Sequence, residues 1–276
     1  AVISGPGATL WGANAVNVVI NLLPRRRRDP PGGVAEVQGG NRGFTGSLEY
    51  GGRLSDDASF RVFTDALAVP HDKTSLGANA VDGWSREHSG FRLDWTPGQD
   101  TVTVNGDVFH ASEQQRAAPN LQVSGGDLQA SWNHVLGNGS SVQVLGYFQQ
   151  SQRYTDGVGF WLNTYDLEAQ HTFQLGSRNE IVWGVGGRIY QDHFDNAQPV
   201  EYLPPSSVEG LGDVFAQDTI TLSPGLKATR GLKAEKDPYA GIAVLPNARL
   251  AWHPTSRWLL WGAVSRAVRA TTLFDE

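Results

Sequence analysis

Apolar and polar residues alternate along most of this chain, and this alternation constrains the fold more than any other feature. In one segment Phe91, Leu93 and Trp95 alternate with Arg92 and Asp94. The same period of two recurs in residues 102–108 and 165–175. Successive side chains of a β-strand point to opposite faces. Each such segment is therefore predicted to be a strand with one apolar face and one polar face.

Short polar turns separate pairs of these segments at intervals of about 40 residues. They read LSDD, TPGQD, LGNGS, LGSRN, LSPG and HPTS, at 54–57, 96–100, 136–140, 175–179, 222–225 and 253–256. Between successive turns the chain has room for two strands and a longer loop. We place these loops at 70–84, 112–124, 153–161 and 193–208. Short turns on one side and longer loops on the other are typical of an outer-membrane β-barrel.

The pattern predicts an all-β chain of about 13 antiparallel strands. They lie at 33–40, 43–54, 58–69, 85–96, 101–112, 125–136, 141–152, 162–175, 180–192, 209–222, 226–236, 242–253 and 257–268. Most exceed the five or six residues common in globular sheets, and their length suits a tilted membrane-crossing strand. Trp95, Trp252 and Trp258 lie close to the short turns, where an interfacial aromatic girdle would lie. A soluble β-sandwich would share the periodicity, with the apolar faces as its core.

A membrane barrel requires its apolar faces to meet lipid and its polar faces to line the lumen. We therefore expect Leu93, Trp95, Val102, Val104, Leu167 and Phe173 on the convex face. We expect Arg92, Asp94, Asn105, Asp107 and Glu168 on the concave face. The inward carboxylates, Asp94, Asp107, Asp166 and Glu168, are interpreted as a polar ladder with Arg61, Arg92 and Arg188 rather than as catalytic acid–base pairs.

Composition and motifs exclude several functions. There is no Cys, so disulfides, zinc–thiolate clusters and a Cys nucleophile are ruled out. A net charge of −6 argues against nucleic-acid binding. No G-x-S-x-G elbow is present, and the seven His residues show no H-E-x-x-H spacing. The Gly-rich start lacks the last Gly of a dinucleotide fingerprint and the Lys of a P-loop. We predict no cofactor, no bound metal and no catalytic residue.

The chain divides into two unequal parts. Residues 1–28 carry no strand–turn repeat and end in the basic run 25–28, after which the repeat begins. Because the chain begins with Ala1 and stops just after a predicted strand, we interpret it as an internal fragment. Thirteen is an odd number, so the first and last strands of the repeat run in the same direction and cannot meet antiparallel. We expect an open sheet with residues 1–28 against its concave face, and a fragment that is unstable and aggregates alone.

Residues 5–17 read GPGATLWGANAVN, and residues 19–21 read VIN. With these segments the first part resembles the end of the plug domain of TonB-dependent outer-membrane receptors. The segments YGGRL at 50–54 and LWGAVSRAVR at 260–269 are similar to hairpins of the same family. Ser4, Val18 and the run 25–28 depart from the family pattern. The plug motif consists of Gly5, Pro6, Gly7, Gly12, Asn14, Asn17 and Asn21.

The resemblance implies that residues 1–28 are the C-terminal part of the plug and residues 29–276 the N-terminal part of the barrel. It implies a receptor in the outer membrane of a Gram-negative bacterium, surrounded by outer-membrane lipid. Such a receptor takes up a scarce nutrient, such as an iron–siderophore, another metal chelate or a corrinoid. Uptake is driven by TonB and its inner-membrane energising complex, through a segment upstream of this chain.

Ligand contacts in this family come from the extracellular loops and the plug apex, and aromatic rings there stack on planar or apolar ligands. By residue type and position, the predicted contacts are Trp84, His71, Tyr154, Phe160, Trp161, His193 and Tyr202. Loop self-packing or an outer aromatic girdle would explain the same residues.

Three other classes of function stay open at this point. A passive porin or channel would use residues 1–28 as a constriction. A barrel enzyme such as an outer-membrane lipase would be favoured by a lumen-facing Ser–His pair. A soluble adhesive β-domain would be favoured by solubility without detergent.

Overall fold

The computed structural model describes residues 2–4, 18–20, 32–197, 201–239 and 241–268. Its main element is a 13-stranded sheet, and the strands β1 (Val2–Ser4) and β2 (Val18–Ile20) pair separately. The sheet strands are β3 (Gly32–Gly40), β4 (Gly43–Arg53), β5 (Ala58–Val69), β6 (Trp84–Trp95), β7 (Asp100–Glu113), β8 (Leu121–Val135), β9 (Ser141–Thr155), β10 (Val158–Leu175), β11 (Asn179–Asp195), β12 (Ser206–Ser223), β13 (Leu226–Asp237), β14 (Gly241–Thr255) and β15 (Trp258–Ser265).

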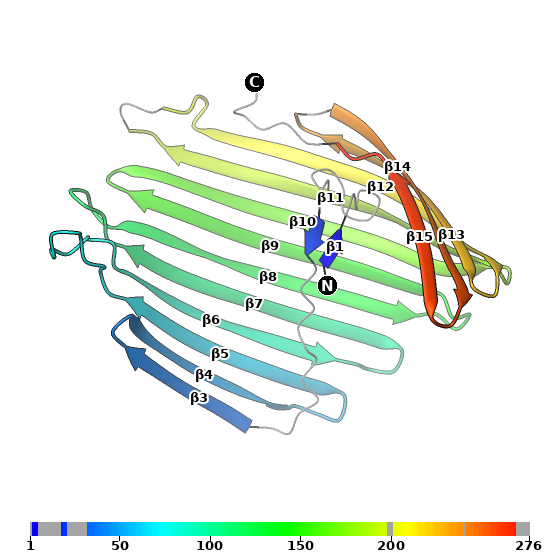
Figure 1. The fold of residues 1–276 in the computed structure, drawn as a ribbon, viewed down its shortest axis with the longest axis horizontal. Helices are drawn as coiled ribbons and strands as arrows, with labels where there is room; N and C mark the ends of the chain where they lie inside the picture. Colours follow the sequence, from blue (N-terminus) through cyan, green and yellow to red (C-terminus); the bar gives the residue numbers. More distant parts are fainter. Residues whose placement is uncertain (1, 5–17, 21–31, 198–200, 240, 269–276) are drawn as a thin grey trace.

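The 13 strands form one up-and-down meander in which every neighbour is antiparallel (Figure 1). β3 and β15 are the two edges, and no pairing joins them. The open sheet predicted from the odd number of strands is therefore confirmed. In Figure 1 the sheet curves, with β14 and β15 bent out of the plane of the earlier strands toward the viewer.

The six predicted short turns all lie on one side of the sheet, at the right in Figure 1, as the alternating strand directions require. The longer connections lie on the other side, and we call this the long-loop end. They are shorter than predicted, because β8, β10, β11 and β12 continue further toward this end.

The loop predicted at 153–161 is wrong. β9 and β10 pair as far as Thr155 and Val158, leaving only Asp156 and Gly157 between them. Both have positive φ, 46° and 79°, as a type I′ hairpin turn requires. The Asp-Gly dipeptide is the usual sequence of such a turn. His253 is a second correction, since it lies inside β14 rather than in a turn.

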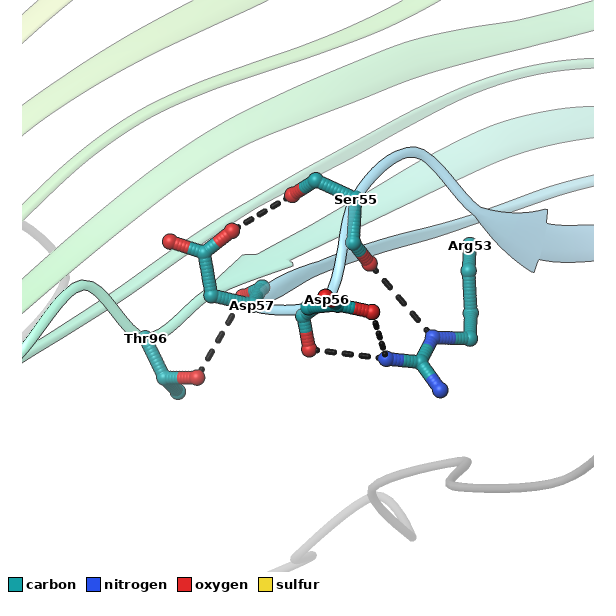
Figure 2. A network of polar contacts seen from close by, with 5 residues as sticks. All are labelled: Arg53, Ser55, Asp56, Asp57 and Thr96. Atoms are coloured by element: carbon teal, nitrogen blue, oxygen red, sulfur yellow. Dashed lines mark hydrogen bonds and ion pairs between the residues drawn. The ribbon is translucent and has the colours of Figure 1, made fainter.

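The turn between β4 and β5 shows how the short turns are held (Figure 2). Arg53 donates to the backbone carbonyl of Asp56 at 2.9 Å and to its carboxylate at 3.2 Å. The Asp57 carboxylate accepts from the Ser55 hydroxyl and, at 3.1 Å, from the indole N–H of Trp95 on β6. The Ser55 hydroxyl holds the pKa of the Asp57 carboxyl below its usual range. This turn is thereby tied to the adjacent hairpin.

The two faces of the sheet differ sharply in exposure. On β10, Asp166 is 8% exposed and its neighbour Leu167 is 62% exposed. On β13 and β14 the apolar residues next to buried Lys233 and Leu245 are likewise exposed. Side chains crowd together on the concave side of a curved sheet and spread apart on the convex side. The face carrying Asp166 and Lys233 is therefore the concave one, and we call it the polar face.

The predicted division of side chains between the faces is confirmed. The cross-strand pairs Leu93–Val104 and Trp95–Val102 lie on the convex, apolar face, and Arg92 pairs with Asn105 on the polar face. Trp95 and Leu167 are exposed, and the other members of the apolar set, Leu93, Val102, Val104 and Phe173, are half-buried. A soluble sandwich would cover this face with a second sheet. The described strands contain no such sheet, because β1 and β2 form only a three-residue ladder.

All seven residues of the plug motif lie outside the described residues. Of this part of the chain, only β1 and β2 are described, and Figure 1 shows them in front of the sheet. The packing of residues 1–28 on the polar face stays a prediction.

We predict that Leu167→Arg destabilises the natural protein containing this sequence by about 2–4 kcal/mol, because a charge then faces the middle of the bilayer. The matched control is Gln149→Arg on the polar face of β9, where we expect a loss below about 1 kcal/mol. Guanidinium unfolding in lipid vesicles measures both. Equal losses at the two positions would contradict the assignment of the faces.

Candidate functional site

Charged side chains form a ladder along the polar face, and its centre lies on β9–β11. Arg188 donates to Asp166 at 2.7 Å and to the hydroxyl of Tyr190 at 3.3 Å. Its guanidinium also lies 5.6 Å from the ring centroid of Tyr147. The Asp166 side chain is only 3% exposed, and its Oδ1 has no hydrogen-bond partner. A buried carboxylate of this kind depends on the adjacent cation.

A second group lies on β12 and β13. The Lys233 ammonium is 3.0 Å from Asp213 and 3.6 Å from Glu235, and both Lys233 and Glu235 are buried. A cavity of about 80 Å³ lies beside it, and its lining includes Glu168, Leu145 and Phe215. One ammonium therefore contacts two carboxylates on this part of the wall.

A third group runs across β5–β8 toward the long-loop end. Arg86 and His88 both contact Asp65, each at 2.8 Å. The other ring nitrogen of His88 lies 3.4 Å from Asp107. Asp107 is directly opposite Asp127 in the β7–β8 register. The group thus joins one arginine and one histidine to three carboxylates.

A glycine makes room inside this third group. A Cβ on Gly90 would lie 2.7 Å from the Phe63 ring and 2.8 Å from the Asp107 side chain. The Phe63 ring packs edge-on against His88, with the centroids 5.0 Å apart. Gly90 therefore lets an aromatic ring and a carboxylate meet on the polar face.

The predicted ladder is confirmed for two pairs, Arg92–Asp94 and Arg188–Asp166, both at 2.7 Å. Two predicted partners differ. Asp107 meets His88 rather than an arginine, and Arg61 lies 3.9 Å from Glu49. The cross-strand register decides these partners, and the alternation pattern does not specify the register.

Three aromatic rings meet at the long-loop end of β10 and β11, and we call them the mouth stack. Phe160 and Phe194 have centroids 4.7 Å apart, and Phe194 and Tyr202 are stacked at 4.1 Å. The side chain of Asn196 donates to and accepts from the backbone of Tyr202, at 2.9 and 2.8 Å. Parity along β10 and β11 places Phe160 and Phe194 on the polar face with Asp166 and Arg188. The sequence prediction named Phe160 and Tyr202 but missed Phe194.

The other predicted contacts do not join the mouth stack. Trp84 lies on the polar face at the start of β6. Trp161 and His193 stack on each other at 5.5 Å, and they lie with Tyr154 on the apolar face. His71 lies in the loop between β5 and β6, and its Nδ1 is buried without a hydrogen-bond partner. Their contact with a ligand stays a prediction.

A serine, a histidine and an aspartate meet near the mouth stack. The Ser206 hydroxyl is 2.6 Å from His193 Nδ1, and His193 Nε2 is 3.3 Å from Asp195. Ser206 and Asp195 are exposed and His193 is half-buried, and all three lie on the apolar face, whereas the enzyme alternative required a lumen-facing Ser–His pair. This arrangement therefore gives that alternative no support.

Within the described part of the chain, no group of three His, Cys, Asp or Glu side chains is arranged to hold a metal ion. The described residues also include no helix long and apolar enough to cross a membrane.

A curved antiparallel meander with a polar concave face and an exposed apolar convex face is typical of an outer-membrane β-barrel wall. The sequence profile of the TonB-dependent receptor-like β-barrel family matches residues 27–276. The chain belongs to this family.

Solved structures agree on the fold. The siderophore receptor PirA from Pseudomonas aeruginosa is 18% identical, with a TM-score of 0.78 over 99% of this chain and 49% of that one. The ferric enterobactin receptor PfeA from the same organism, in a mutant form, is 15% identical, with a TM-score of 0.77 and the same coverage. The copper transporter OprC is 14% identical, with a TM-score of 0.71 over 96% and 50%. The chain thus spans about half the length of these proteins. No curated protein sequence matches it.

We predict that Arg188→Ala destabilises the folded natural protein by about 3 kcal/mol, because it leaves Asp166 charged and buried without its cation. The double variant Arg188→Ala with Asp166→Asn is expected to recover more than half of that loss. Denaturant unfolding of both variants measures the coupling. If the double variant is no more stable than Arg188→Ala alone, the pair does not depend on charge compensation.

Proposed function

We propose that this chain forms the end of the plug and the N-terminal half of the barrel of a TonB-coupled receptor for a metal chelate. Residues 1–28 are the plug part and residues 29–276 the barrel part. The receptor lies in the outer membrane of a Gram-negative bacterium, and TonB with its inner-membrane complex energises uptake. The observation that carries the proposal is the curved wall with its polar face inward, together with the family match over 27–276.

The named neighbours support the chelate class. Two are receptors for siderophores or ferric enterobactin, and one is described as a copper transporter. At 14–18% identity these likenesses concern the fold, so the ligand class is our inference. Corrinoids fit the same class of bulky metal complex.

The mouth stack is the part of the wall best suited to contact a ligand. Its rings lie on the polar face at the long-loop end, which would be the extracellular end of the barrel. Phe160, Phe194 and Tyr202 are half-buried, and the Asn196 side chain fixes the Tyr202 backbone. Trp84 extends the aromatic surface on the same face. We assign Tyr154, Trp161 and His193 to an outer aromatic girdle, because they lie on the apolar face.

TonB dependence tests the transport mechanism. The natural gene containing this sequence is expressed in an iron-starved Gram-negative host lacking its own siderophore receptors, with and without TonB. Uptake of ⁵⁵Fe is measured for a hydroxamate, a catecholate and a carboxylate chelate, and radiolabelled cobalamin is tested in parallel. We expect at least one of these solutes to enter only when TonB and the membrane potential are both present. Entry that persists in the TonB deletion would support the passive channel instead.

For the solute that enters, Phe194→Ala is expected to weaken binding by about ten-fold, because a stacked ring of the mouth stack is lost. The matched control is Trp161→Ala, which removes a ring at the same height on the apolar face. It should change binding less than about two-fold. Equilibrium binding to purified protein in detergent measures both. Equal effects of the two substitutions would contradict the assignment of the mouth stack as the ligand contact.

A further inference from the structure

Charge is unevenly distributed along the polar face. In the half of each strand nearest the long-loop end, the described inward side chains include ten carboxylates but only four basic Lys and Arg groups, together with one histidine, His88. The carboxylates are Asp65, Asp107, Glu113, Asp127, Asp166, Asp192, Glu209, Asp213, Glu235 and Asp237. The basic groups are Arg86, Arg153, Arg188 and Lys233. We call this half of the polar face the outer wall.

The other half of the same face is nearly balanced. Its described inward charges are the carboxylates Glu49, Asp94, Glu168 and Glu180 and the basic groups Arg53, Arg61, Arg92, Lys227 and Arg249. Glu36 lies on the same face midway along β3, between the two halves. The long-loop connections do not neutralise the outer wall either. Their described charged residues are Arg42, Lys73 and Arg116 against Asp72, Asp82, Asp156 and Glu201. The negative excess therefore belongs to the outer wall.

Several outer-wall carboxylates are held by neutral groups. Asp192 accepts from the hydroxyl of Ser207 at 2.6 Å and from its backbone N–H at 3.2 Å. Glu209 accepts from the hydroxyl of Tyr239. Such hydrogen bonds fix a carboxylate in place and leave its charge uncompensated. Fixed, uncompensated charge on the wall of a narrow passage has a field that attracts solutes of opposite sign.

The mouth stack lies on this same outer wall and adds a second, independent preference. The face of an aromatic ring carries the negative part of its quadrupole and attracts cations. Phe160, Phe194 and Asp192 share the polar face by strand parity, and Tyr202 stacks on Phe194. Rings and carboxylates thus favour the same sign of solute.

We propose that the outer wall makes this receptor selective for cationic or neutral metal chelates and discriminates against polyanionic ones such as ferric tris-catecholates. This proposal rests on the proposed function and specifies its ligand class by charge. It sets this chain apart in ligand class from the ferric enterobactin receptor that shares its fold. Asp107, Glu209 and Asp192 are the residues expected to determine specificity.

The test compares three Fe(III) chelates of different charge on the purified natural protein in detergent: cationic ferrioxamine B, neutral ferrichrome and polyanionic ferric enterobactin. Binding is followed by tryptophan fluorescence quenching at low and at physiological salt. We expect the cationic chelate to bind at least about ten-fold more tightly than the polyanionic one at low salt, and the ratio to shrink as salt screens the wall. Tightest binding of ferric enterobactin would overturn the proposal.

Matched variants show which half of the polar face causes the preference for cationic chelates. Asp107→Asn with Glu209→Gln neutralises two outer-wall charges, and Glu49→Gln with Glu180→Gln neutralises two charges in the balanced half. The first variant should reduce the cation preference by about three-fold, and the second should leave it unchanged. Equal effects would show that overall charge, and not the outer wall, sets the preference.

A second measurement tests the electrostatic field of the outer wall without a ligand. The chain has no Cys, so Gln149→Cys on the polar face of β9 accepts a single fluorophore. We expect iodide to quench it several-fold less than neutral acrylamide does, and the outer-wall variant to restore iodide quenching. Strong iodide quenching in the unmodified wall would refute the proposal. If no chelate binds but iodide is excluded, the chelate function fails while the charge selectivity stands.

Discussion

Inside a bilayer every backbone N–H and C=O must find its partner within the protein, and the rest of this structure depends on that constraint. A strand crossing lipid can satisfy it only by pairing on both sides. Eleven strands of the sheet do so, from β4 to β14, and the edges β3 and β15 each keep one unpaired side. β3 and β15 run in the same direction, so closure with antiparallel neighbours needs an odd number of further strands. A second copy in the same membrane orientation would present its edges in parallel, so it could not close the sheet with antiparallel neighbours.

The same membrane setting explains why the concave, inner face of the sheet is polar, whereas the interior of a soluble domain would be apolar. In the proposed outer-membrane receptor, lipid covers the convex face, so large apolar side chains are exposed there without cost from water. On the concave face, several charged groups pair with one another across strands. Arg188 with Asp166 and Lys233 with Asp213 are such contacts. Stability and solute selection thus depend on the same face. Asp192 and Glu209, which accept hydrogen bonds from neutral groups, contribute to the field of the outer wall.

Much of the architecture could be predicted from the sequence, because a period of two and polar turns are local signals. Thirteen strands, their faces and the side of each turn follow from them. The Asp156–Gly157 turn was missed because the extended alternation on both sides of it is weak, although the Asp-Gly pair itself was a signal. Partners across strands were harder to predict. Whether Asp107 meets an arginine or His88 depends on register, which the alternation leaves open. Phe194 was missed for the same reason, since its role arises from stacking between Phe160 on β10 and Tyr202 in the following loop.

The central claim is that the apolar face meets lipid and the polar face lines the lumen. Because the natural sequence of this region has no Cys, single cysteines can be placed one at a time along β10, from residue 163 to residue 171, in the natural protein. Each is labelled with an environment-sensitive fluorophore after reconstitution, and quenching by brominated lipid is measured. The account predicts strong quenching at positions 165, 167 and 169 and weak quenching at 164, 166 and 168. Quenching without a period of two, or with the opposite phase, would contradict it.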